Sequence, residues 1–350
     1  MQMTLRYNDS YRGDTMSRID DVISKYEKLG INQQLDYQKF YLYSIITHST
    51  AIEGSTVTEV ENQLLFDEGI SSDKPMQEQL MNLDLKNAYE EAFAIADRQE
   101  KTTVELLCSL SGIVMKNTGS LYNTIAGTFN SADGELRLLN VSAGRGGKSY
   151  MAWQKVPDRL KGFCKWLNEA RERIDRGDLE SVYRMSFEAH YRMVTIHPWA
   201  DGNGRMARLV MNMIQREAGV TPSIVKKEKK AQYIQSLSDA QAAGDETVFI
   251  DFMLKHHIEN IEEQIKEYQD SITNDTITAD NDTINDTINL SSKEQMVFNI
   301  IRNNPDVKIN DIIASSGFSR PTVTRAISTL KEKSLIERIG SRKSGAWKII

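Results

Sequence analysis

The stretch that decides the fold reads HPWADGNGRMAR over residues 197–208. It combines an imidazole, a carboxylate, two glycines, a side-chain amide and two arginines. Apolar residues recur at helical spacing over 179–195 and again over 206–218, which predicts a loop between two helices with residues 204–205 opening the second helix. This mixture of polar groups is poorly suited to a core and well suited to a phosphate site.

The residue types support an anion site at the start of the second helix. A helix start offers unpaired N–H groups and the positive end of the helix dipole. Gly202 and Gly204 allow the backbone to turn sharply and to approach a ligand closely. Arg205 and Arg208 are three residues apart, so they share a helix face and can hold neighbouring phosphates through paired hydrogen bonds.

Two further residues in the stretch are candidates for chemistry. Asp201 is a candidate Mg²⁺ ligand, because Mg²⁺ usually takes one or two carboxylates together with phosphate oxygens. His197 is a candidate general base, since an imidazole titrates near neutral pH.

The same string matches the Fic-domain motif, HPFx[D/E]GNGRxxR, and departs from it only in having Trp199 where the motif has Phe. The chain therefore resembles the Fic family. The resemblance implies a mainly α fold, a Fic-type helical bundle with one β-hairpin. It also implies transfer of AMP from ATP to a protein hydroxyl, with release of pyrophosphate.

The resemblance assigns a role to each motif position. His197 would deprotonate the target hydroxyl and Asp201 would hold Mg²⁺. The nucleotide phosphates would be bound by Gly202, Asn203, Gly204, Arg205 and Arg208, with Arg205 on the β-phosphate side and Arg208 on the γ-phosphate.

A second motif lies at the end of a helix predicted over 36–52, where residues 49–54 read STAIEG. Ser49 and Glu53 are four residues apart and fit the [S/T]xxxE[G/N] inhibitory motif of Fic proteins. The resemblance implies that Glu53 pairs with Arg208, so that ATP binds only in an unproductive pose.

Residues 127–153 are rich in Gly, Asn and Ser and predict a β-hairpin with strands over 136–141 and 149–153. In Fic proteins such a flap docks the target by strand pairing. Its edge here would be formed by Tyr150, Met151, Ala152 and Trp153, although a plain surface hairpin is the alternative. The resemblance also places Tyr233 against the adenine, with an ordinary core or surface tyrosine as the alternative.

Four regions are predicted along the chain. Residues 1–110 form an N-terminal helical region that includes the inhibitory helix at about 36–54, and 111–266 form the Fic catalytic core. Residues 267–290 form a linker, because Asn-Asp-Thr-Ile occurs three times between 274 and 288 and cannot build a core. Further helices are predicted over 17–29, 77–98, 103–115, 156–173, 229–240 and 247–266.

Residues 291–350 form a basic unit that resembles a winged helix-turn-helix. It holds 11 Lys and Arg against 5 Asp and Glu, a net charge of +6 where the rest of the chain carries −12. Ser319 caps the expected recognition helix, on which Arg320, Thr322 and Arg325 are the expected DNA contacts. A protein-interaction or dimerisation module fits the same pattern, and both alternatives stay open.

Composition limits the class of protein. The net charge of −6 excludes nucleic-acid binding by bulk charge, and Cys108 and Cys164 lie in apolar helical contexts that favour a reducing compartment. No apolar run is long enough to span a bilayer and no signal-peptide pattern starts at Met1, so no membrane partner is expected and the cytoplasm is the expected location. Residues 256–257, both His, are expected to be polar residues near a helix end.

The sequence thus predicts a self-inhibited protein adenylyltransferase. Its expected partners are ATP with Mg²⁺, a protein target with a Ser, Thr or Tyr hydroxyl, and its own chain through self-modification or dimer formation. Alternatives on the same loop are removal of AMP, with Glu53 positioning water, and transfer of another phosphate-linked group. A DNA-binding regulator that uses the Fic domain as a nucleotide sensor is the alternative from another class.

Overall fold

The computed structural model describes residues 9–142, 149–278, 290, 292–316, 318–333, 335–339 and 346–349. Its internal contacts divide the chain into two compact units, one of residues 1–68 with 74–274 and one of residues 69–73 with 275–350. Each unit is described by itself. Helices dominate the described residues, which confirms the predicted mainly α fold class.

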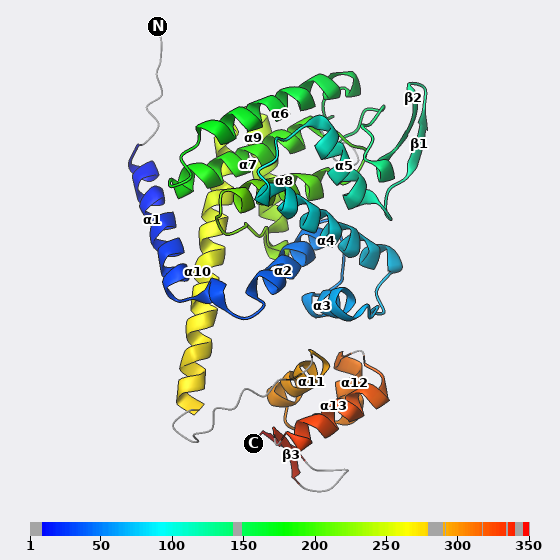
Figure 1. The fold of residues 1–350 in the computed structure, drawn as a ribbon, viewed down its shortest axis with the longest axis vertical. Helices are drawn as coiled ribbons and strands as arrows, with labels where there is room; N and C mark the ends of the chain where they lie inside the picture. Colours follow the sequence, from blue (N-terminus) through cyan, green and yellow to red (C-terminus); the bar gives the residue numbers. More distant parts are fainter. Residues whose placement is uncertain are drawn as a thin grey trace. The chain divides into compact units, whose positions relative to one another are not determined.

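The first unit is a helical bundle (Figure 1). Its α-helices are α1 (Asp9–Lys28), α2 (Tyr37–Ile52), α3 (Glu59–Glu68), α4 (Met76–Asp97), α5 (Val104–Met115), α6 (Val156–Arg173), α7 (Leu179–Ile196), α8 (Asn203–Glu217), α9 (Lys230–Ala243) and α10 (Thr247–Thr278). Short 3₁₀ turns are η1 (Ile31–Gln33), η2 (Ser131–Asp133), η3 (Trp153–Lys155) and η4 (Lys227–Lys229). These bounds agree closely with the helices predicted from hydrophobic periodicity, except at the ends of α1 and α10.

The bundle is organised around α8, which packs against α7, α4 and α5. Twelve of its fifteen residues are buried. A helix that is buried on all sides belongs to the centre of a core rather than to its surface. The loop that opens α8 is therefore held on the most rigid part of the unit.

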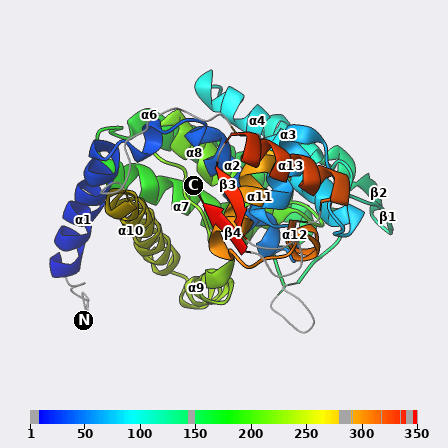
Figure 2. The same ribbon diagram turned by 90° about the horizontal axis from the view of Figure 1, so that it is seen from below.

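The last helix of the unit, α10, runs further than the sequence predicts. It continues to Thr278, through the first Asn-Asp-Thr-Ile repeat at 274–277 and into the stretch predicted as a linker. Polar residues lower helix propensity only slightly, and no Gly or Pro interrupts this segment. The remaining repeats, over 279–289, lie outside the described residues. Figures 1 and 2 both place α1 beside α10, where Arg18 donates hydrogen bonds to both carboxylate oxygens of Glu262.

The predicted strand positions of the β-hairpin are wrong. The hairpin is formed earlier, by β1 (Leu121–Thr124) and β2 (Gly127–Asn130), with Tyr122 opposite Phe129. Neither 136–141 nor 149–153 forms a strand, and the only β-bridge between the described parts of this region joins Ser142 to Ser149. Their backbone groups are bound elsewhere instead: Arg137 N–H, for example, donates to Pro198 O at 3.1 Å.

The second unit contains α11 (Ser292–Asn303), α12 (Ile309–Ser316), α13 (Arg320–Glu332), β3 (Ile336–Ile339) and β4 (Ala346–Ile349). The two strands pair antiparallel, and Trp347 of β4 is buried. The order of elements agrees with the one expected from the sequence. The tip that joins the strands, at 341–345, lies outside the described residues, and the assignment as a winged helix stays a prediction.

The cysteines and the helix lengths of the described residues bear on the expected compartment. Cys108 and Cys164 are both free thiols. Among the residues that the structure describes, no helix combines the length and the apolar character needed to cross a bilayer.

Burial lowers the pKa of all five histidines of the chain. Burial lowers the pKa of His190 and His257 to about 3, that of His197 and His256 to about 4, and that of His48 below its ordinary value. His256 and His257 lie within α10 and are buried, so the expectation that they are polar residues near a helix end is wrong. Both ring nitrogens of His257 are buried without a hydrogen-bond partner.

These depressed values predict acid-sensitive folding. The unfolded chain takes up protons on its histidines near pH 6.5, whereas His190, His197, His256 and His257 of the folded chain take them up only near pH 3 to 4, so stability falls as the pH drops below 6.5. We expect the melting temperature to decrease steadily between about pH 7 and pH 5. His257→Leu removes one of these groups and should flatten the slope, as measured by thermal unfolding across this range. Identical slopes for the two proteins would contradict the assignment.

Candidate active site

The loop over 197–202 joins α7 to α8 and has a left-handed backbone conformation at both ends. His197 adopts a left-handed conformation with φ of 52°, and Gly202 does so with φ of 79° just before α8. A side chain at 202 would also collide with Met115, whose Sδ would be 2.7 Å from an added Cβ. A non-glycine residue in the left-handed region is unusual and often marks a functional position. The helix begins at Asn203, so its N-terminal N–H groups belong to residues 203–205.

The loop is held in place by its own side chains. Trp199 is completely buried, and its Nε1 donates to Gly134 O at 3.0 Å. Asn203 accepts from Trp199 N–H at 3.1 Å and donates to Trp199 O at 2.9 Å. The side-chain amide of Asn203 therefore fixes the loop conformation. The expected contribution of Asn203 to phosphate binding would come from its backbone N–H instead. The aromatic residue that replaces the Phe of the motif serves as a buried anchor.

A buried arginine that sequence reasoning missed also holds the loop. Arg137 is 1% exposed and donates to three carbonyl oxygens, those of His197 at 2.7 Å, Leu139 at 2.7 Å and Met151 at 2.5 Å. It thus ties the 197–202 loop to both segments of the predicted flap. The signal in the sequence was a charged residue inside the apolar run 136–139, a position where a charge is costly unless it is fully hydrogen-bonded.

His197 lies in this braced loop under an aromatic cover. The ring of Tyr150 stacks on its imidazole, with the centroids 3.7 Å apart and the planes at 15°. Burial lowers the pKa of His197 to about 4. The imidazole is therefore neutral at physiological pH and able to accept a proton.

Arg205 and Asp201 occupy opposite environments. Arg205 is buried at the end of α5, with one nitrogen 3.1 Å from Met115 Sδ and another 3.4 Å from Val114 O, while its Nε is buried without a partner. The Asp201 side chain is 63% exposed, and its Oδ1 accepts from Gly202 N–H at 2.6 Å. A single accessible carboxylate beside a helix N-terminus fits Mg²⁺, which completes its shell with phosphate oxygens and water. Among the described residues, no three or more His, Cys, Asp or Glu side chains are grouped so that they could hold a metal ion by themselves.

Arg208 connects α8 to α2. The guanidinium group is 2% exposed and donates to Ser49 Oγ at 2.8 Å, to Ser49 O at 3.0 Å and to Glu53 Oε1 at 2.6 Å. Burial disfavours both charges, but Arg208 holds the pKa of Glu53 below its usual range and keeps it ionised. The two residues of the STAIEG string thus meet the last arginine of the loop motif, although 155 positions separate Glu53 from Arg208.

The Glu53 carboxylate also lies over the start of α8. A Cβ atom added at Gly204 would be only 2.6 Å from Glu53 Oε1 and 3.2 Å from an Arg208 nitrogen. This is the N-terminus where the sequence predicts an anion to bind, and a carboxylate is itself an anion that a helix N-terminus stabilises. Glycine at 204 is therefore required for the close approach of Glu53.

The hydroxyl of Tyr233 lies between Arg208 and His190. The residue is 1% exposed, and its hydroxyl lies 3.4 Å from an Arg208 nitrogen and 2.8 Å from His190 Nε2. Because burial lowers the pKa of His190 to about 3, this histidine stays neutral beside Arg208. Tyr233 and His190 hold the guanidinium group from behind, and the adenine contact of Tyr233 stays a prediction.

The flap residues lie beside the loop without forming a strand. Tyr150, Met151 and Ala152 line a cavity of about 350 Å³ together with Thr195, two residues before His197. Tyr150 N–H donates to Val141 O, and the Met151 and Ala152 carbonyls accept from Arg137 and from Lys155 N–H. Trp153 begins the turn η3. Several backbone groups of the expected docking edge are thus already occupied within the chain.

The expected DNA contacts lie in the second unit. Arg320, Thr322 and Arg325 are on α13, and both arginines are exposed. Arg320 donates to Asn310 Oδ1 at 2.5 Å, and the Thr322 hydroxyl bonds to Ser319 Oγ. Their role in binding DNA stays a prediction.

The Arg137 contacts generate a stability prediction. Arg137→Met keeps the length of the side chain but leaves three part-buried carbonyl groups without this donor, so the free energy of unfolding should fall by about 3 kcal/mol. Chemical denaturation measures this change. Arg159→Met, at an exposed arginine beside the flap, is the control and should change stability by less than about 0.5 kcal/mol. Equal stability of the two variants would refute the bracing role.

Comparisons with known proteins agree with the loop motif. The model of the Fic/DOC family matches residues 101–215. A protein adenylyltransferase fic-1 from Caenorhabditis elegans is 26% identical over 244 residues, which are 68% of this chain and 44% of that protein. A protein adenylyltransferase Fic from Drosophila grimshawi is 28% identical over 214 residues, 59% of this chain and 40% of that protein. The chain thus spans less than half the length of these curated relatives.

Solved structures show the same fold. A Fic domain containing signalling protein from Bacteroides thetaiotaomicron aligns with a TM-score of 0.58 and 20% identity, covering 71% of this chain and 96% of that one. A Fic family protein from Desulfovibrio desulfuricans aligns with a TM-score of 0.57 and 18% identity over 100% of this chain and 97% of that one. Together with the loop geometry, the family match means that residues 101–215 of this chain form a domain of the Fic/DOC family.

Proposed function

We propose that this protein transfers AMP from ATP to a hydroxyl group of a protein and that Glu53 restrains the reaction. The observation that carries the proposal is the position of the Glu53 carboxylate, bonded to Arg208 and close to Gly204 at the start of α8. The names of the relatives support transfer of an adenylyl group. The hydroxyl would belong to Ser, Thr or Tyr of another protein or of this chain itself.

His197 would act as the base. Its neutral imidazole can accept the proton of an approaching hydroxyl, whose oxygen then attacks the α-phosphorus of ATP while pyrophosphate leaves. The hydrogen bonds of Arg137 and Asn203 to the loop keep the imidazole in position. A correctly positioned base lowers the barrier to reaction. Because Tyr150 covers one face of the ring, the hydroxyl would approach from elsewhere or displace it.

The start of α8 would bind the phosphates. Free N–H groups at residues 203–205 and the buried Arg205 and Arg208 supply positive potential where negative charge develops. Asp201 would hold Mg²⁺ against the phosphates. The metal, when bound, would neutralise phosphate charge.

Inhibition follows from competition for the same donors. While Glu53 occupies Arg208, the γ-phosphate of ATP lacks its partner and the α-phosphate is not aligned for attack. Removing the carboxylate would release the guanidinium group and remove a negative charge from the phosphate site. The unproductive pose implied by the inhibitory motif has this physical basis.

We expect Glu53→Gly to increase AMP transfer by at least about tenfold, the effect of roughly 1.4 kcal/mol in the barrier. Transfer is measured as label from α-labelled ATP with Mg²⁺ on protein, with and without cell lysate. Glu53→Gln keeps the size but not the charge and should give an intermediate rate. Glu100→Gly, at an exposed glutamate bonded to Arg98, is the control and should behave like wild type. Equal labelling by Glu53→Gly and wild type at saturating ATP would rule out the inhibitory role.

The lowered pKa of His197 predicts the pH dependence of the freed enzyme. In the Glu53→Gly background the base stays deprotonated down to about pH 4, so the rate should show no fall near pH 6.5, where an ordinary histidine titrates. His197→Ala in the same background should lose labelling and still bind ATP. A rate profile with an acidic limb centred near pH 6.5, or retained labelling in His197→Ala, would contradict the assignment of the base.

A further inference from the structure

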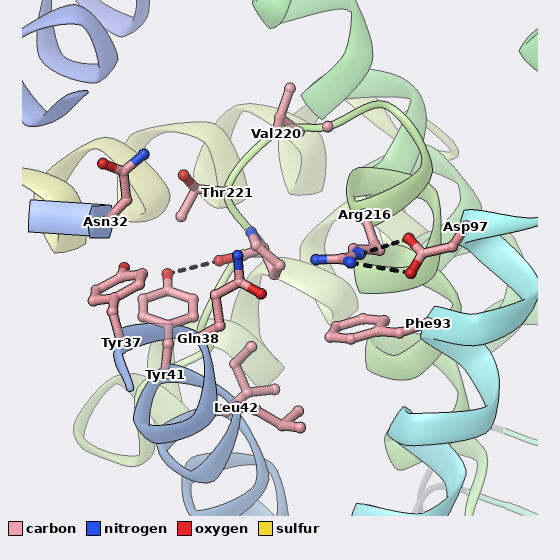
Figure 3. Close-up of a pocket in the computed structure, with 13 residues that line it drawn as sticks. Asn32, Tyr37, Gln38, Tyr41, Leu42, Phe93, Asp97, Arg216, Val220 and Thr221 are labelled. Atoms are coloured by element: carbon pink, nitrogen blue, oxygen red, sulfur yellow. Dashed lines mark hydrogen bonds and ion pairs between the residues drawn. The ribbon is translucent and has the colours of Figure 1, made fainter. Parts of the chain in front are cut away.

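A second cavity, of about 400 Å³, lies at the far ends of the two helices that carry the Glu53–Arg208 pair (Figure 3). The first half of α2 forms one wall, with Tyr37, Gln38 and Tyr41. The last turn of α8 and the segment after it form another, over 216–222. The helical rise places this end of α8 roughly 20 Å from Gly204. No residue of the 197–208 loop lines the cavity, so it is separate from the phosphate site.

Three aromatic side chains line the cavity, Tyr37, Tyr41 and Phe93. The rings of Tyr37 and Tyr41 stack at 5.3 Å, and Phe93 on α4 lies on another side, where the Arg216 guanidinium group is 5.7 Å from its ring centre. Tyr41 is fixed by its hydroxyl, which donates to Pro222 O at 2.7 Å. Flat, rigid rings of this kind favour a planar aromatic ligand that can stack.

The polar groups of the cavity carry no surplus charge. Arg216 is neutralised by Asp97 through two hydrogen bonds of 2.8 and 3.0 Å (Figure 3). Asn32 Oδ1 is buried without a hydrogen-bond partner, whereas the Gln38 side chain lies at the exposed mouth of the cavity, where its amide is open to a ligand. In Figure 3 the Gln38 amide lies between the Tyr41 ring and the Arg216 guanidinium group.

These groups select for one kind of ligand. A side-chain amide offers a donor and an acceptor side by side, the pattern that pairs with the N6 and N7 edge of adenine. The paired charges of Arg216 and Asp97 give a phosphate or a carboxylate no unopposed cation. The cavity therefore fits an uncharged purine nucleoside better than a nucleotide.

We propose that this cavity binds a purine nucleoside and that its occupancy strengthens inhibition by Glu53. Both α2 and the end of α8 contribute walls to the cavity in the arrangement in which Glu53 contacts Arg208, so a ligand that contacts both walls would favour this arrangement over one in which α2 has moved. The bound ring would fix the start of α2 against the end of α8, at the opposite end of α2 from Ser49 and Glu53. The inhibitory part of this inference rests on the proposed function, whereas the binding part does not.

Binding is tested with adenosine as the probe, by calorimetric titration of the full chain in the presence of saturating ATP and Mg²⁺. We expect one adenosine site that ATP does not remove. Gln38→Leu and Val220→Trp, which remove an amide and fill the cavity, should each weaken binding at least tenfold. Gln34→Leu, at an exposed amide outside the cavity, should leave it unchanged. No binding tighter than about 1 mM, complete displacement by ATP, or equal affinity in all variants would overturn the proposal.

Regulation is tested by the AMP-transfer assay at saturating ATP. Adenosine should slow the wild-type protein severalfold with a half-effect at its dissociation constant, and it should leave Glu53→Gly unaffected because that variant has no inhibitory contact to strengthen. Adenosine that binds without changing wild-type transfer would overturn the regulatory part. Absence of transfer in every variant would instead refute the proposed function and leave the binding result standing.

Discussion

A buried positive charge on Arg208 is the constraint on which the site depends. A guanidinium group at 2% exposure is tolerated only if its donors are bound, and here Ser49, Glu53 and Tyr233 bind them. Its partners come from α2 and α9, so this one side chain fixes the positions of two helices relative to α8. The neutral His190 completes the arrangement behind Tyr233 without adding a competing charge. A ligand that binds Arg208 must replace the hydrogen bonds that it displaces with others of similar strength.

The helical architecture and the loop could be predicted from the sequence because both depend on local patterns. Periodic apolar residues predict α2, α4 and α7 within a residue or two, and the glycines and polar groups of 197–208 identify a loop with phosphate chemistry. The pairing of Glu53 with Arg208 connects residues 155 positions apart. No rule of residue spacing predicts a pairing over such a separation, and only the resemblance to the Fic family implies it.

The errors have physical causes. The segment around 136–141 contains the leucines and valine of a strand, but Arg137 binds the carbonyl groups that a partner strand would need. The hairpin forms instead at 121–130, where Tyr122 stacks on Phe129 across the two strands. The end of α10 was placed too early because polar repeats suggest a linker, whereas a helix that is already formed can continue through them at little cost. The adenine contact of Tyr233 stays a prediction; the hydrogen bonds of its hydroxyl to Arg208 and His190 involve residues that only the folded chain brings together.

The uneven burial of α8 and α2 determines which part of the site can move. Twelve of the fifteen residues of α8 are buried, against seven of the sixteen residues of α2. Displacing α8 would disrupt the centre of the unit and carry a cost comparable to that of unfolding it, whereas displacing α2 exposes much less. The proposed phosphate site at the start of α8 is therefore expected to stay in place, while α2 can move relative to it. A signal that acts on α2 would control the proposed AMP transfer without disturbing the residues of α8 and its loop that are proposed to carry it out.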